Sequence, residues 1–292
     1  MNASLSACPD AAQRHALRAL QLPGIEQLPA YAVAYAWSTM RAWRPPVPEL
    51  QPGGGYACAF TLTPSLHRRW HGFFRTETSR AIPYLYAQGA ATLLQRRLLS
   101  DLSLPPGRVR HLRQLTQHVR GTAPHALAER QRLDCRLQRI NRIATGVLLV
   151  VTETQLADAD GQWLATVEDH FAVTGVDCAA WPALAHDRAA AADFAGLRAR
   201  DAALPRQDAN VGEWVIGDDW GRRYATLSGE LHPVHLGRWG ARLLGRRQTT
   251  LQATALRNLV VRQLADVGLL PERLDVTFCR PVALGRRVSI VQ

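Results

Sequence analysis

The spacing of hydrophobic and polar residues predicts two successive units, each with a long helix followed by antiparallel strands. The first helix is expected to begin at 81–83, because apolar side chains then recur every three or four residues and share one face: Tyr86, Ala90, Leu93, Leu94 and Leu98. The polar positions between them are expected to face away from this stripe, namely Gln88, Thr92, Gln95 and Arg96. The pattern is typical of a long, partly buried helix.

Strand-like patterns surround this helix. One precedes it at 56–63, and four follow it at 109–119, 126–140, 144–154 and 163–174. The last two are joined by the sequence Asp-Ala-Asp-Gly, which is typical of a hairpin turn. A helix followed by a meander of antiparallel strands indicates the α+β class.

The same order returns toward the C-terminus. A short strand is expected at 214–217, a turn after 224–229, a helix at 252–267, and strands at 274–279 and 287–291. Two units of the same order suggest a duplication. The second unit stops about two strands earlier than the first. Either the chain is shortened at its end or the second sheet is completed in another way, because exposed strand edges invite pairing.

Composition and chain-breaking residues place the unit boundaries. A segment rich in Pro and Gly closes an N-terminal preamble of residues 1–55, in which a short helix is expected near 10–20. The first unit is expected at 56–177 and the second at 207–292. A linker rich in Ala, Asp and Arg, with some helix in it, is expected at 178–206 between them.

Length and apolar content indicate a globular protein. The chain has 292 residues, of which 47% are hydrophobic, enough for a sizeable core. The longest apolar run is far shorter than the roughly 20 residues that a membrane-spanning helix needs. The N-terminus lacks the pattern of a secretory signal, so a cytoplasmic location is expected. The five cysteines are scattered singly, which favours buried free thiols over disulfides or a zinc site.

The chain is strongly basic, with a formal net charge of +11, and all of its 35 basic residues are arginine. A bias of the coding DNA is the simplest explanation for the absence of lysine. A basic surface nonetheless favours an acidic or phosphorylated ligand, such as coenzyme A or an acidic carrier protein. The arginines are dispersed and no nucleic-acid-binding module accompanies them, so nucleic acid is not an expected partner.

The segment 224–235 has the strongest potential for chemistry, because Glu230, His232 and His235 lie within six residues. A carboxylate and a neutral imidazole that converge on one water can remove and return protons near pH 7. From spacing alone, a polar loop whose histidines bind nearby backbone groups is at least as good an interpretation. A metal site is not expected, because Pro233 interrupts any helix that would align the two histidines and no fourth ligand is near.

A family resemblance becomes specific at 228–235, which reads Ser-Gly-Glu-Leu-His-Pro-Val-His. This segment resembles the signature S-G-D-x-N-P-[IVL]-H of MaoC-like dehydratases and (R)-specific enoyl-CoA hydratases. The likeness continues through Ala-Arg-Leu-Leu-Gly at 241–245, the helix start at 250–254, and the strand at 275–282. The first half is similar to the degenerate N-terminal repeat of double hot-dog members at 81–87 and 161–166, so the resemblance runs from about 56 to 292.

The resemblance implies an α+β double hot-dog fold, in which each repeat wraps a sheet around one long helix. It also implies a hydratase or dehydratase acting on enoyl or 3-hydroxyacyl thioesters of coenzyme A or acyl carrier protein, without a cofactor, and it allows a homodimer. The family pattern assigns catalysis to Glu230, His235 and His232, and substrate binding to Ser228, Gly229, Gln252 and Ala253. In this family a backbone N–H at the start of the central helix holds the thioester carbonyl, a role that falls to Ala253 here. The first repeat has no copy of the signature, so one site per chain is expected.

Three positions depart from the family pattern. Glu230 replaces an aspartate, His232 replaces an asparagine, and Gln252-Ala253 replaces His-Gly at the helix start. These changes are compatible with an enzyme of altered substrate preference. They are also compatible with a repeat that has lost the reaction and serves as an acyl-binding or partner-binding scaffold, or with a thioesterase, because one fold can host several chemistries.

Overall fold

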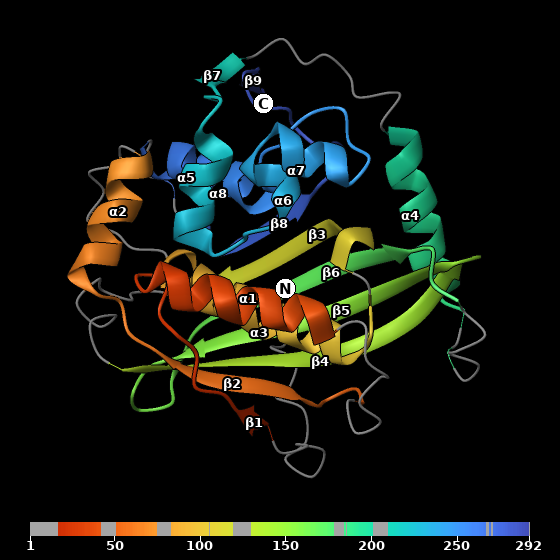
Figure 1. The fold of residues 1–292 in the computed structure, drawn as a ribbon, viewed down its shortest axis with the longest axis horizontal. Helices are drawn as coiled ribbons and strands as arrows, with labels where there is room; N and C mark the ends of the chain where they lie inside the picture. The colour runs from red at the N-terminus through yellow and green to blue at the C-terminus, as the bar shows by residue number, and fades with distance from the viewer. Residues whose placement is uncertain are drawn as a thin grey trace, which may run out of the picture.

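The computed structural model describes residues 17–41, 51–74, 83–104, 106–118, 130–177, 184, 186–200, 210–266, 269 and 271–291. Its largest element is a seven-stranded sheet with the strand order β1-β2-β4-β5-β6-β3-β8 (Figure 1). The strands are β1 (Arg18–Ala19), β2 (Gly55–Phe60), β3 (Val109–His118), β4 (Gln131–Ala144), β5 (Val147–Ala157), β6 (Trp163–Thr174) and β8 (Arg273–Thr277). All neighbours are antiparallel except β1 and β2, which are parallel.

The first long helix, α3 (Pro83–Asp101), packs against strands β2, β4, β5 and β6. Its predicted apolar stripe is confirmed, since Leu93, Leu94 and Leu98 are almost fully buried. The prediction that its polar side faces away from the core is wrong, because Gln88 and Gln95 are only 3% and 8% exposed. Gln88 and Thr92 contact Arg257 and Ser228 of the second unit, and Gln95 contacts Asp169 of β6, so these polar side chains meet protein instead of water.

The four predicted strands of the first unit are present, but only β4, β5 and β6 form a meander, because β3 pairs with β6 instead of β4. Strand β6 has the bounds that were predicted for it. Strand β3 begins at its predicted residue and ends one residue before its predicted end. The hairpin between β5 and β6 is fixed by Asp158, whose Oδ1 accepts hydrogen bonds from the backbone N–H groups of Asp160 (3.0 Å) and Gln162 (2.8 Å). Gly161 adopts a φ of 82°, the left-handed conformation that such turns require.

The second unit has its own long helix, α8 (Ala253–Asp266), close to the predicted range. Its strand β8 pairs with β3 of the first unit and so extends the large sheet. Strand β7 (Asn210–Val215) pairs with β9 (Arg287–Val291) as a separate antiparallel ribbon. The second unit therefore completes its pairing across the two units, which is one of the two arrangements that the sequence left open.

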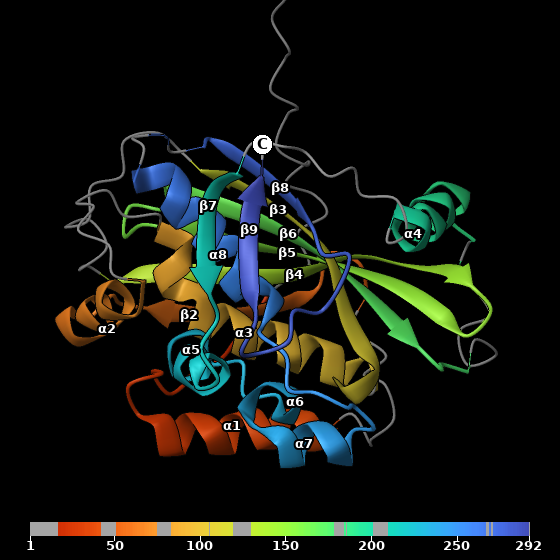
Figure 2. The same ribbon diagram turned by 90° about the horizontal axis from the view of Figure 1, so that it is seen from above.

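Short helices connect β7 to α8: α5 (Trp220–Ser228), α6 (Pro233–Leu236) and α7 (Arg238–Leu243). The turn expected after 224–229 is present, since α5 ends at Ser228 and Gly229 caps it in the left-handed conformation. Figure 2 shows that α5, α6 and α7 lie on the side of the molecule where α1 is found.

Residues 17–41, within the predicted preamble, are part of the folded body. Helix α1 (Leu28–Arg41) packs on α3, where the Tyr31 hydroxyl donates to the carbonyl oxygen of Gly89 at 2.7 Å. The helix predicted near 10–20 is wrong at Arg18–Ala19, because these residues form strand β1. The first part of that predicted helix lies outside the described residues.

Helix α2 (Pro64–Phe74), which buries Trp70 and Phe74, was also missed by the sequence analysis. Helix α4 (Arg188–Arg200) lies in the predicted linker, and a 3-10 turn spans Pro106–Arg108.

The prediction of free thiols is confirmed for the described cysteines. Cys58 and Cys135 are buried, and burial raises the pKa of each thiol to about 12. Cys279 is half-buried, while Cys8 and Cys178 lie outside the described residues. Within the described part of the chain, every helix is too short or too polar to cross a bilayer.

Candidate active site

The turn after α5 positions Glu230. The N–H of Gly229 donates to the carbonyl oxygen of Ala225 at 2.9 Å, and Gly229 has a φ of 68°, which glycine adopts without strain. A Cβ atom at Gly229 would lie 1.7 Å from the hydroxyl oxygen of Tyr31 on α1. Only glycine therefore allows the turn to pack this closely against α1, and the next residue is the predicted catalytic carboxylate.

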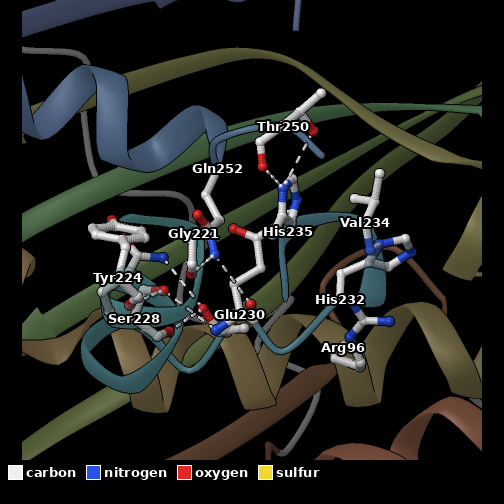
Figure 3. A network of polar contacts seen from close by, with 12 residues as sticks. Arg96, Gly221, Tyr224, Ser228, Glu230, His232, Val234, His235, Thr250 and Gln252 are labelled. Atoms are coloured by element: carbon white, nitrogen blue, oxygen red, sulfur yellow. Dashed lines mark hydrogen bonds and ion pairs between the residues drawn. The ribbon is translucent and has the colours of Figure 1, made fainter. Parts of the chain in front are cut away.

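Glu230 and His235 face each other (Figure 3). The Nε2 atom of His235 lies 3.4 Å from Oε1 of Glu230, and the Nδ1 atom of His235 lies 2.7 Å from the carbonyl oxygen of Thr250. A carbonyl oxygen only accepts hydrogen bonds, so Nδ1 carries a proton and Nε2 is the nitrogen directed at the carboxylate. The pair can therefore hold one exchangeable proton between Nε2 and Oε1.

The electrostatic surroundings keep Glu230 ionised near neutral pH. Burial favours its neutral form, but the hydrogen bond and charge of His235, together with His232 and Arg96, outweigh burial and lower the pKa of Glu230 to about 2. Burial, the Arg96 guanidinium and His235 lower the pKa of His232 to about 4. The site thus combines a carboxylate with a neutral His232, whose Nδ1 accepts from the backbone N–H of Val234 at 3.4 Å.

A cavity of about 350 Å³ opens beside this pair. Glu230, His232 and His235 line it together with Ala253 and Thr254, the first residues of α8. Several apolar side chains complete the lining, among them Leu99, Leu104, Phe171, Leu251, Leu256 and Phe278. The first N–H groups of a helix lack intrahelical partners and lie at the positive end of its dipole. The cavity therefore joins acid/base groups, helix N–H donors and an apolar wall.

The structure places the other predicted site residues behind this cavity. Ser228 is fully buried, and its Oγ donates to the carbonyl oxygen of Tyr224 (3.0 Å) and accepts from the N–H of Glu230 (3.3 Å). Gln252 is also fully buried, and its Nε2 donates to the carbonyl oxygen of Gly221 at 2.9 Å. Among the described residues, Ser228, Gly229 and Gln252 are not part of the cavity lining, while Ala253 is. The hydrogen bonds of Ser228 and Gln252 hold the turn that contains Glu230 in position.

Arg96 on α3 is a site residue that the sequence did not identify. It lines the cavity, donates a hydrogen bond to the hydroxyl of Tyr35, and lies 4.2 Å from the centre of the Tyr35 ring. Its positive charge lowers the pKa of both Glu230 and His232. The only sequence signal was its place among the polar positions of an amphipathic helix.

A second acid/base pair lines another part of the same cavity. The Nε2 atom of His111 on β3 lies 2.9 Å from Oδ1 of Asp169 on β6, and the His111 ring packs between Phe171 and Phe278. Burial opposes ionisation of Asp169, but contacts with His111 and two glutamine side chains lower the pKa of this carboxyl. Asp169 is therefore a charged group in the interior of the first unit.

A buried arginine joins the two long helices behind this pair. Arg257 on α8 is 1% exposed. It donates to Oε1 of Gln114 (2.5 Å), Oε1 of Gln88 (3.2 Å) and Oδ1 of Asn258 (2.7 Å). Gln114 in turn donates to Oδ1 of Asp169 at 2.6 Å. The network compensates two buried charges through side chains of both units.

The described residues contain no group of three or more His, Cys, Asp or Glu side chains placed to bind one metal ion. His232 and His235 have ring centroids 5.9 Å apart, and the Nδ1 atoms of the two rings contact the N–H of Val234 and the carbonyl oxygen of Thr250.

Neither a protein-family model nor a curated protein matches the sequence, but solved structures do. HtdX of Mycobacterium tuberculosis is 15% identical with a TM-score of 0.59, covering 80% of this chain and 87% of HtdX. A MaoC-like dehydratase is 13% identical with a TM-score of 0.57, covering 76% of this chain and 80% of its own. The full-length peroxisomal multifunctional enzyme type 2 from Drosophila melanogaster is 17% identical with a TM-score of 0.55, and the match covers 81% of this chain and 43% of that enzyme. These likenesses confirm the predicted architecture: the chain has an α+β double hot-dog fold, which it shares with a MaoC-like dehydratase.

Proposed function

We propose that the chain is a hydratase or dehydratase that interconverts enoyl and 3-hydroxyacyl thioesters at one site per chain. The observation that carries this proposal is the 3.4 Å approach of His235 Nε2 to Glu230 Oε1 on the wall of a cavity that also contains the start of α8. The dehydratase and multifunctional-enzyme structures that resemble this chain agree with the proposal.

In the hydration direction, a water molecule held between Glu230 and His235 gives a proton to the pair as its oxygen bonds to C3 of the enoyl group. The C2–C3 π electrons move toward the thioester carbonyl, where the N–H of Ala253 and the helix dipole stabilise the developing negative charge. The pair then returns the proton to C2, so that one water is added overall. Dehydration follows the reverse path, and His232 tunes the charge of the pair.

The apolar part of the cavity suits an acyl chain, and the basic character of the protein suits a phosphorylated thioester carrier. Coenzyme A and acyl carrier protein are both candidates. We also propose the cytoplasm as the location and 56–177 and 207–292 as the two repeats. A homodimer is compatible with the proposal, since each chain contains its own site.

Glu230 extends one methylene further than the aspartate of the family signature, a change in reach of roughly 1.5 Å. The fixed imidazole of His235 meets this longer side chain at 3.4 Å, so the carboxylate is still directed into the site. At the helix start, the Cβ atom of Ala253 narrows the approach to its N–H where the family has glycine. These two differences predict a preference for substrates other than those of the standard family members.

The test is a hydration assay with crotonyl and longer enoyl thioesters, supplied on coenzyme A and on carrier protein, with detection of the 3-hydroxyacyl product. Wild-type protein and the exposed-site control Glu213→Gln should turn over, while a Glu230→Gln, His235→Ala double variant should not. Equal product with wild type and the double variant would refute the proposal. Release of free thiol without hydration would identify a thioesterase. Saturable thioester binding without turnover, retained in the double variant, would identify a scaffold.

A further inference from the structure

The segment that includes α7 exposes large apolar side chains among arginines. Trp239 is 80% exposed, Leu243 is 85% exposed and Leu244 is 40% exposed. Four exposed arginines alternate with them: Arg238, Arg242, Arg246 and Arg247. The sequence from 231 to 252 contains no Asp or Glu. In the described part of the chain, no ion pair joins these four guanidinium groups to a carboxylate.

Helix α1 presents a second apolar strip to the outside. Val33, Trp37 and Met40 are 57%, 58% and 51% exposed, and their spacing places them on one face of the helix. Residues 28–40 include no charged side chain. Figure 1 shows α1 and α7 on the side that faces the viewer, and Figure 2 shows both along its lower margin. The two helices therefore lie on the same side of the molecule, and the strip of α1 is on the face opposite its buried Tyr31 and Tyr35.

This side also borders the candidate active site. Leu244 and Arg246, which follow α7, line the cavity that contains Glu230 and His235. Arg96, another lining residue, contacts Tyr35 of α1. The segment after α7 therefore borders the cavity directly, and α1 contacts the cavity lining through Arg96.

From these observations we infer that this side of the protein binds the surface of an anionic lipid bilayer. We call it the α1–α7 face, made up of Val33, Trp37, Met40, Trp239, Leu243 and Leu244 with Arg238, Arg242, Arg246 and Arg247. Trp and Leu side chains enter the boundary between headgroups and acyl chains, while arginines bind lipid phosphates. Clusters of exposed apolar side chains of this kind are rare on soluble surfaces that contact only water.

A bilayer fits this face better than other occupants. An acidic carrier protein would neutralise the arginines of α7 but would leave the uncharged strip of α1 without a complementary surface. A second copy, packed by two-fold symmetry on the same face, would bring two arginine clusters of like charge together. A planar anionic surface can satisfy both strips at once. The inference goes beyond the proposed reaction and does not depend on Glu230 or His235.

The test is co-sedimentation of the full chain with phosphatidylcholine vesicles, with and without about one third phosphatidylglycerol. We expect binding to the anionic vesicles, accompanied by a blue shift of tryptophan fluorescence. The double variant Arg238→Gln, Arg242→Gln should bind at least tenfold more weakly than wild type, because each basic side chain near such a surface contributes on the order of a fivefold increase in binding. The double variant Trp239→Ala, Leu243→Ala should weaken binding and reduce the blue shift, to which Trp37 of the same face still contributes. The matched controls are Trp163→Ala, at a 42% exposed tryptophan of β6, and Arg287→Gln, at an exposed arginine of β9, and both should bind like wild type.

All of these substituted side chains are exposed, so circular dichroism should confirm that every variant is folded. Absence of binding to anionic vesicles would overturn the inference, as would equal binding by the α1–α7 variants and their controls. A dimer in solution that Trp239→Ala, Leu243→Ala dissociates, without vesicle binding, would assign the face to a second copy. Saturable binding of an acidic carrier protein without vesicle binding, lost in the arginine variant, would assign it to that partner. Either result would contradict the lipid proposal and leave the hydratase proposal to its own assay.

Discussion

Tyr31 and Gly229 lie so close that a Cβ atom on Gly229 would stand 1.7 Å from the Tyr31 hydroxyl oxygen. The same hydroxyl donates to the carbonyl oxygen of Gly89 on α3 at 2.7 Å. Helix α1, the central helix of the first unit and the turn before Glu230 therefore meet at one buried phenol. The N-terminal segment, which looks like a preamble in the sequence, supports the candidate site directly.

This contact predicts that Gly229→Ala destabilises the protein more than Gly161→Ala. Both glycines have positive φ values, of 68° and 82°, and both substitutions should cost about 1 kcal/mol for the backbone conformation. A Cβ at Gly161 meets no atom within 4 Å, whereas at Gly229 it overlaps Tyr31, which should add roughly 1–3 kcal/mol. Urea unfolding measures the difference. Equal losses for the two variants would show that the turn moves freely away from α1.

A second prediction concerns acid sensitivity. The pKa of His232 is lowered from 6.5 to about 4 in the folded protein, so the unfolded chain binds a proton first as the pH falls. His232 therefore reduces the stability of the folded state progressively between about pH 6.5 and pH 4. His232→Asn keeps a side chain that caps α6 but removes this titration, and should lose less stability than wild type between pH 7 and pH 5.

The comparison uses urea unfolding midpoints of both proteins at the two pH values. Glu230 does not interfere in this window, because its pKa falls from 4.5 to about 2 and its contribution is lost only in more acidic solution. An identical decrease for wild type and His232→Asn would contradict the account of a partly buried, neutral His232.

Local patterns in the sequence were sufficient to predict much of the fold. The apolar stripe of α3, the strand β6 and the hairpin at Asp158 each depend on neighbours in the chain, and each is confirmed. The polar side of α3 could not be interpreted in the same way, because Gln88 is buried by Arg257, which lies 169 residues away. A periodic pattern shows which side of a helix is polar, but it does not show whether water or another unit covers that side.

The residues of the candidate site that are close together in the sequence could be predicted, whereas those that the fold brings in from elsewhere could not. Glu230, His232 and His235 lie within six residues, so a motif could identify them. Arg96 influences two of these groups from the other unit, and no local signal predicts that proximity. Ser228 and Gln252 match positions of the family pattern, but their contacts with backbone groups behind the cavity could be seen only in three dimensions.

The buried network between the two units gives a third prediction. Arg257→Met should remove the donors to Gln114, Gln88 and Asn258 and leave these buried amide oxygens without their hydrogen bonds, at a cost of about 1–3 kcal/mol for each oxygen left unpaired. The matched control is Arg287→Met, because Arg287 forms an exposed ion pair with Glu213 at 3.2 Å, which should contribute at most about 1 kcal/mol. Urea unfolding of both variants measures the contrast. If both variants lose a similarly small amount of unfolding free energy, the packing of α3 against α8 does not depend on the network.

The central claim is that Glu230 and His235 act together on one water, and a double-mutant cycle on hydration tests it most directly. The values of kcat/KM are measured for wild type, Glu230→Gln, His235→Ala and the double variant with one enoyl thioester. Residues that act as a unit are strongly non-additive, so the double variant should be about as slow as the slower single variant. If the two losses instead multiply, or if either single variant keeps wild-type activity, the two groups do not share the reaction and the account is contradicted.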